Sequence, residues 1–163
     1  MYPYRSNTSI KNTTINTRET NNVIDLKQDQ RLLQLLEIAQ QETQQSLSAF
    51  DALMQNKALQ QDVEMLRNAY LDEVKHLKLL QEIWYNITGK SQSQPQPKST
   101  KTNSEAVRTE IEKTLLQEME QTDFFRELLM LIPETELRDI LYEIITDKQD
   151  HCIRLCFLFS KYQ

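Results

Sequence analysis

The chain has 163 residues, of which 39% are hydrophobic, 26% are charged and only one is glycine. So little glycine excludes sandwiches, barrels and doubly wound sheets, because their tight turns need residues that accept a positive φ. The net charge of −5 argues against a nucleic-acid partner, and no apolar run approaches the roughly 20 residues of a membrane-spanning helix. We therefore expect one all-helical domain without a membrane partner.

The N-terminal segment is polar and rich in Asn and Thr. Such a composition buries too little apolar surface to offset the entropy of ordering. We predict a disordered tail over residues 1–24 and a helical domain over residues 25–163. The segment lacks the apolar core of a secretory signal, so we expect a cytoplasmic protein.

Two helices are expected between Asp25 and Thr88, where the sequence has neither glycine nor proline. Apolar residues recur there at helical spacing, and Asn56-Lys57 marks the expected turn. The first apolar stripe comprises Leu32, Leu35, Leu36, Ile38, Ala39, Leu47, Phe50 and Leu53. The second comprises Leu59, Val63, Leu66, Ala69, Tyr70, Leu77, Leu80, Ile83 and Trp84.

A polar linker rich in Ser, Gln and Pro follows over about residues 89–103, and two more helices come after it. We predict that Thr102 and Glu105 form a capping box for the third helix, and that Pro133 ends this helix and opens the fourth. Their stripes comprise Val107, Ile111, Leu115, Phe125, Leu128 and Ile132, and then Leu137, Ile140, Leu141, Ile144, Ile145, Leu155 and Leu158. Four methionines are expected to fill the core: Met54, Met65, Met119 and Met130.

The linker is long enough to run from one end of a bundle to the other. Fifteen extended residues reach about 50 Å, whereas a helix of about 28 residues is about 42 Å long. Two helical hairpins joined in this way form a four-helix bundle with one long crossover. The alternative is an exchange of hairpins between protomers, so a homo-oligomer is one expected state.

Each of the four helices carries one charged residue within its apolar stripe: Glu42, Glu73, Glu118 and Lys148. A charge inside a core needs a partner or a metal, because burying it alone is costly. The only two histidines, His76 and His151, follow Glu73 and Lys148 by three residues. Residues three apart share one side of a helix, so the two hairpins look like diverged copies of one unit.

This pattern resembles the di-iron carboxylate proteins of the ferritin-like superfamily, in which two helices each give a Glu and two give Glu-x-x-His. The segment from Asp72 to His76, with the Ile-Trp-Tyr-x-x-Thr-Gly-Lys run ending at Lys90, is similar to the second-helix motif of small rubrerythrin-related proteins of spore-forming bacteria. The resemblance covers about residues 25–160. It implies a ferritin-like antiparallel four-helix bundle, non-haem iron as cofactor, and five candidate metal ligands: Glu42, Glu73, His76, Glu118 and His151.

The sixth ligand position departs from the family's pattern, because Lys148 stands where the family has a bridging Glu. Three interpretations follow. In the first, Lys148 neutralises the carboxylates in a metal-free bundle. In the second, a weakened one- or two-metal site persists, either because Lys148 is neutral or displaced or because Asp147 is a substitute ligand. In the third, these charges are solvent-exposed and unrelated to one another.

If metal binds, the resemblance implies iron-dependent oxidation or peroxide reduction of the ferroxidase or rubrerythrin kind, a role in oxidative stress. Glu42 and Glu118 would be terminal ligands and Glu73 the bridging one. The sequence contains no Cys-rich electron-transfer segment like that of rubrerythrins, so turnover is expected to need an external reductant. If metal does not bind, as Lys148 favours, we expect a structural or interaction protein, and the resemblance adds a spore-associated location as an alternative.

Overall fold

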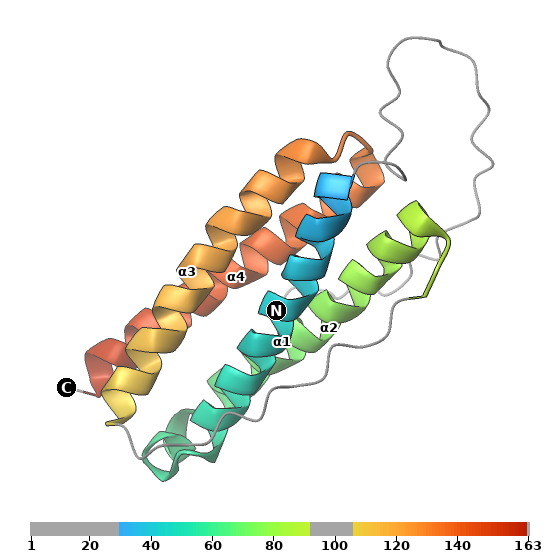
Figure 1. The fold of residues 1–163 in the computed structure, drawn as a ribbon. Coiled ribbons are helices and arrows are strands. Elements are labelled where there is room, and N and C mark those ends of the chain that lie inside the picture. The colour runs from blue at the N-terminus through green and yellow to red at the C-terminus, as the bar shows by residue number, and fades with distance from the viewer. Residues whose placement is uncertain (1–29, 92–105, 163) are drawn as a thin grey trace, which may run out of the picture.

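The computed structural model describes residues 30–91 and 106–162. Its elements are α1 (Gln30–Gln55), a 3-10 helix η1 (Lys57–Asp62), α2 (Val63–Thr88), α3 (Val107–Leu131) and α4 (Thr135–Lys161). The described ranges contain no strand, so the predicted all-α four-helix bundle is confirmed (Figure 1). None of these helices is long and apolar enough to cross a membrane. The predicted tail over residues 1–24 lies outside the described residues.

The helices form two antiparallel hairpins, α1 with α2 and α3 with α4, packed against each other (Figure 1). Asn56, which follows α1, donates from Nδ2 to Glu110 Oε2 in the first turn of α3 at 3.0 Å. The start of α3 therefore lies at the end of the bundle where α2 begins. At the other end α2 stops at Gly89, whose φ of +67° suits glycine and whose N–H donates to the Tyr85 carbonyl. The end of α2 and the start of α3 therefore lie at opposite ends of the bundle, as a long crossover requires.

Apolar side chains form two separate buried clusters, one toward each end of the bundle. Each cluster draws residues from all four helices, because the apolar stripes of the helices converge on one axis. Between the two clusters lies a layer of buried polar and charged side chains. The clusters include Leu36, Ile83, Phe125 and Ile144 toward the α3–α4 turn, and Phe50, Leu66, Ile111 and Leu155 toward the other end.

Two helix starts differ from the prediction. α3 begins at Val107, whereas the predicted capping pair Thr102 and Glu105 lies outside the described part of the chain. α4 begins at Thr135, so Pro133 precedes the fourth helix instead of opening it. The residue between them is extended, as an N-cap is.

The turn between the first two helices is present at Asn56 but is longer than expected. The residues Lys57–Asp62 form η1, and α2 therefore begins only at Val63. Asn56 starts this short helix, since its Oδ1 accepts a hydrogen bond from the Ala58 N–H at 3.0 Å.

Two of the four methionines expected in the core lie on the surface. Met119 and Met130 are 51% and 76% exposed, whereas Met54 and Met65 pack against the cluster around Phe50. The prediction for Met119 and Met130 is wrong because both residues lie on the outward side of α3, away from its buried stripe.

Candidate functional site

A layer of charged side chains crosses the middle of the bundle between the two apolar clusters. Glu73 and His76 come from α2, Glu118 from α3, and Lys148 and His151 from α4, and all five are fully buried. Each pair on α2 and α4 is spaced by three residues, which turns both members toward the bundle axis. The interpretation that these charges are solvent-exposed is therefore wrong.

Lys148 lies at the centre of this layer. Its Nζ donates to Glu73 Oε1 at 2.9 Å, to Glu118 Oε2 at 3.3 Å and to Gln121 Oε1 at 2.5 Å. Burial disfavours the ammonium, but the charges of Glu73 and Glu118 outweigh this effect and raise the pKa of Lys148. Burial also opposes ionisation of Glu73, yet the Lys148 charge and hydrogen bonds from both histidines hold the Glu73 pKa well below its usual value. Lys148 is therefore a buried cation held between two carboxylates.

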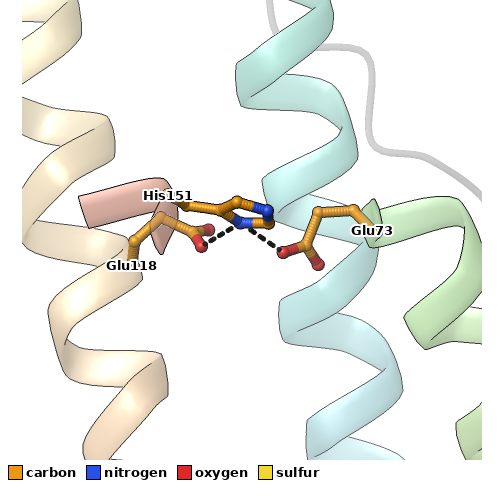
Figure 2. Close-up of side chains that lie close together, drawn as sticks. All are labelled: Glu73, Glu118 and His151. Carbon is orange, nitrogen blue, oxygen red and sulfur yellow. Dashed lines mark hydrogen bonds and ion pairs between the residues drawn. The ribbon is translucent and has the colours of Figure 1, made fainter. Parts of the chain in front are cut away.

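His151 bridges the same two glutamates from the other side. Its Nδ1 lies 3.2 Å from Glu118 Oε2 and 3.3 Å from Glu73 Oε1. Figure 2 shows the ring between the two carboxylates. Its Nε2 lies 3.4 Å from Asp72 Oδ2. Burial disfavours the imidazolium, but hydrogen bonds to these three carboxylates raise the pKa of His151 to about 10. The ring is therefore cationic at neutral pH.

His76 repeats this arrangement on the opposite helix. Its Nε2 lies 3.0 Å from Asp147 Oδ2, and its Nδ1 lies 3.5 Å from Glu73 Oε1. Burial again disfavours the charged ring, but hydrogen bonds to Asp147 and Glu73 raise the pKa of His76. Asp147, which the sequence offered as a substitute ligand, is engaged here, and it also accepts a hydrogen bond from Lys75 Nζ at 3.1 Å.

The two aspartates form a crossed pair of contacts between α2 and α4. Asp72 of α2 contacts His151 of α4, and Asp147 of α4 contacts His76 of α2. Each aspartate directly precedes the charged residue of its own helix, Glu73 or Lys148. Carboxylates in this position orient metal-binding histidines in other proteins, and they equally stabilise an imidazolium when no metal is present.

Glu42 lies apart from the layer. It is half-buried on α1, and its Oε2 and main-chain carbonyl accept hydrogen bonds from Gln121 Nε2 at 3.3 and 3.1 Å. Ser46, one turn later, occupies the inward position, and its Oγ donates to Glu118 Oε1 at 2.5 Å. The first helix therefore presents a hydroxyl to the layer, with the Glu42 carboxylate outside it.

Sequence reasoning missed Ser46 and Gln121, which are both buried and both contact the layer. Ser46 could have been found from a strict seven-residue repeat along α1, because this repeat predicts that Ser46 is buried. The buried positions that follow the repeat are Leu32, Leu36, Ala39, Thr43, Ser46, Phe50 and Leu53. On α3, Gln121 comes three residues after Glu118 and so shares its face.

Three buried side chains offer ligand atoms close enough for one metal ion. One ligand atom from each of Glu73, Glu118 and His151 lies within 4.8 Å of the other two. One buried oxygen beside them, Glu73 Oε2, has no hydrogen-bond partner in the described residues. These distances suit a single cation, but Lys148 Nζ already bonds both glutamates, so a metal ion must first displace the ammonium. A two-metal centre does not fit, because Lys148 replaces one carboxylate and Glu42 lies outside the layer.

Comparisons of the chain with protein-family models, with curated proteins and with solved structures found no match.

Proposed function

We propose that this protein is a ferritin-like bundle whose di-iron site is degenerate, closed by Lys148, and that it works as a metal-free or weakly metal-binding structural or interaction protein. The observation that carries the proposal is the position of Lys148 Nζ, 2.9 Å from Glu73 Oε1 and 3.3 Å from Glu118 Oε2. The ammonium makes with these oxygens the contacts that a bound metal would make.

Charge supports this function. A divalent ion that bound beside Lys148 would meet a fixed cation at a few ångströms in a layer without solvent access, which is strongly unfavourable. Displacing Lys148 instead would leave its ammonium without partners inside the bundle, and removing a partner from a buried ion pair costs about 3–5 kcal/mol. Either route weakens metal binding.

The second candidate function is iron-dependent oxidation or peroxide reduction at a single metal ion. It is favoured by the close approach of Glu73, Glu118 and His151 and by the unpartnered Glu73 Oε2 beside them. In this function the three side chains would hold the ion, and Asp72 would orient the His151 ring through Nε2. A bound ferrous ion would supply one electron to the oxidant, and an external reductant would supply the remaining electrons and restore the ferrous state.

The experiment that separates the two functions measures iron bound per chain after anaerobic reconstitution with ferrous ion and desalting, for the native protein and for Lys148→Glu. We expect no stoichiometric iron in the native protein and at least one equivalent in Lys148→Glu, because the substitution removes the cation and supplies a carboxylate. Lys113→Glu, at an exposed position of α3, is the matched control for the added charge and should retain no iron.

A native protein that retains an equivalent of iron would overturn the metal-free proposal, and peroxide and O2 consumption should then be assayed. Cobaltous ion provides an independent readout, because its visible absorption reports binding without turnover. Absorption in the native protein that is lost in His151→Gln would show that His151 is one of the ligands of the ion.

A further inference from the structure

Lys148 meets a carboxamide as well as two carboxylates in the buried layer. Its Nζ lies 2.5 Å from Gln121 Oε1 on the neighbouring helix α3, which is the shortest of its three contacts with these groups. A C=O bond is about 1.23 Å long, so the carboxamide carbon Cδ of Gln121 lies at most about 3.7 Å from Nζ. This separation is close to the roughly 3–3.5 Å at which an enzyme holds two reacting atoms.

We propose that Lys148 and Gln121 react with each other and join α3 to α4 by an isopeptide bond, with ammonia as the leaving group. The layer contains the three parts that this reaction needs: an amine as nucleophile, a carboxamide as electrophile and a carboxylate to carry protons. The bond goes beyond the closed site proposed above, since a metal-free layer is equally compatible with a free lysine.

Both reacting side chains are held away from water. Lys148 is fully buried and Gln121 is 2% exposed, so water does not compete for the carbonyl carbon. Well-oriented groups reach effective molarities of about 10⁵–10⁸ M, which offsets the low reactivity of an ordinary amide. The ammonium is the stable form of Lys148 between its two carboxylates, so the free amine is rare and the reaction is slow.

Glu118 is positioned to carry the protons. Its Oε2 accepts a hydrogen bond from Lys148 Nζ at 3.3 Å, and its Oε1 accepts one from Ser46 Oγ at 2.5 Å. Transfer of one proton from Nζ to Oε2 turns an ion pair into a neutral amine beside a neutral acid. This step leaves no unpaired charge in the dry interior and produces the nucleophile.

The Ser46 hydroxyl can stabilise the oxyanion. Its Oγ lies 3.0 Å from Gln121 Oε1 as well as 2.5 Å from Glu118 Oε1, and its single hydrogen can bond only one of the two oxygens at a time. Once Glu118 has taken a proton, its oxygens are weaker acceptors. The hydrogen then turns to the negative charge that develops on Gln121 Oε1 during the attack.

The reaction balances in atoms and in charge. The neutral Nζ attacks Cδ, so the new C–N bond forms and an electron pair of the C=O bond moves to Oε1. The C=O bond forms again as the bond from Cδ to Nε2 breaks, and Nε2 leaves as ammonia with a proton that Glu118 relays from Nζ. The proton first taken by Glu118 leaves too, so one ammonium ion is released. Gln121 Nε2 lies 3.3 Å from the carboxylate of the half-buried Glu42, which gives the departing ion a partner at the edge of the bundle.

The test is the intact mass of the denatured full chain, after the native protein has been kept folded at room temperature for several days. We expect a mass that is lower than the sequence mass by one ammonia molecule. Lys148→Arg, which keeps the cation, and Gln121→Met, which keeps both ion pairs, should retain the full mass. Lys113→Arg, at an exposed position of α3, is the matched control and should lose ammonia as the native chain does.

A tryptic digest locates the bond. Trypsin does not cleave after an acylated lysine, so the bond at Lys148 should link the peptide Thr114–Arg126, which contains Gln121, to the peptide Asp139–Arg154. Ammonia lost from any other Asn or Gln leaves these two peptides separate. Glu118→Gln, whose folding is checked by circular dichroism, should slow the loss of mass about 100-fold or more, because no carboxylate then carries the protons.

Three results would overturn the proposal. The first is a native chain that retains the full sequence mass after the incubation. This result leaves the metal-free function intact, because bound iron measures that function separately. The second is a loss of ammonia that persists in Lys148→Arg, and the third is a digest in which the two peptides are separate although the mass is lower.

Discussion

Replacing Lys148 by Met tests whether the ammonium is what makes the buried carboxylates tolerable. Met has a similar length and apolar character, so it can fill the space beside Phe125, whose ring lies 5.7 Å from Lys148 Nζ, and little cavity is left. What is lost is the cation that bonds Glu73, Glu118 and Gln121. Removing one partner of a buried ion pair costs about 3–5 kcal/mol, a large part of the roughly 5–15 kcal/mol that stabilises an ordinary domain.

For a chain of this length a loss of this size lowers the melting temperature by about 6–20 °C. The free energy of unfolding should be measured by urea titration with helical circular dichroism as the signal, with a chelator present so that no metal replaces the missing cation. Lys113→Met, at an exposed position of α3, is the matched control and should change the free energy by less than about 0.5 kcal/mol.

A second variant separates lost charge pairing from lost packing. Adding Glu73→Gln to Lys148→Met removes one carboxylate that has lost its ammonium partner, so the double variant should recover part of the stability lost in the single one. An unfolding free energy for Lys148→Met within about 0.5 kcal/mol of the native value would refute the ion-pair reasoning. The reasoning would also be refuted if Glu73→Gln lowered the unfolding free energy of Lys148→Met by as much as it lowers that of the native protein.

Two further predictions concern the pH dependence of stability and the end of α4. Folding raises the pKa of His151 from 6.5 to about 10, so the charged ring contributes at most about 5 kcal/mol of stability, which is complete below pH 6.5 and is lost as the pH rises through 10. In urea unfolding with a chelator present, the difference in unfolding free energy between the native protein and His151→Gln should therefore become smaller from pH 6 to pH 10. A difference that becomes larger over this range would contradict the prediction. Asp62 Oδ2 accepts hydrogen bonds from Lys161 Nζ at 2.8 Å and from the Tyr162 hydroxyl at 2.6 Å. Asp62→Asn should therefore speed amide hydrogen exchange in the last turn of α4, while the melting temperature stays nearly unchanged. Unchanged exchange in that turn would show that these hydrogen bonds do not hold it.

Much of the fold follows from the sequence alone. The absence of glycine and proline between Asp25 and Thr88, the polar linker and four apolar stripes are sufficient to predict four helices in two hairpins. The buried charges on α2, α3 and α4 follow too, because each lies seven residues from apolar neighbours and turns inward with them. The exact start of α4 does not follow from the position of Pro133, because an N-cap residue separates this proline from the first turn of the helix.

The side chain that α1 gives to the layer could not be found from spacing between helices. Successive side chains of a helix point about 100° apart around its axis. An error of one residue in the expected inward position of α1 therefore places Glu42 on the bundle axis, where the structure has it at the edge and Ser46 inward. The crossed contacts of Asp72 and Asp147 were also hidden. They depend on the relative height of α2 and α4, and η1 contributes to that height by adding six residues before α2 begins.

The position of the charged layer, midway between two apolar clusters, has a consequence for how the helices align. Apolar stripes alone allow a helix to slide by one turn, about 5.4 Å, and still bury leucines against leucines. Such a slide of α4 would carry Lys148 out of reach of Glu73 and Glu118 and leave all three charges without partners inside the bundle. The layer therefore fixes the register of the helices. It excludes the shifted packings that the apolar clusters alone would accept, which are nearly equal in buried apolar area.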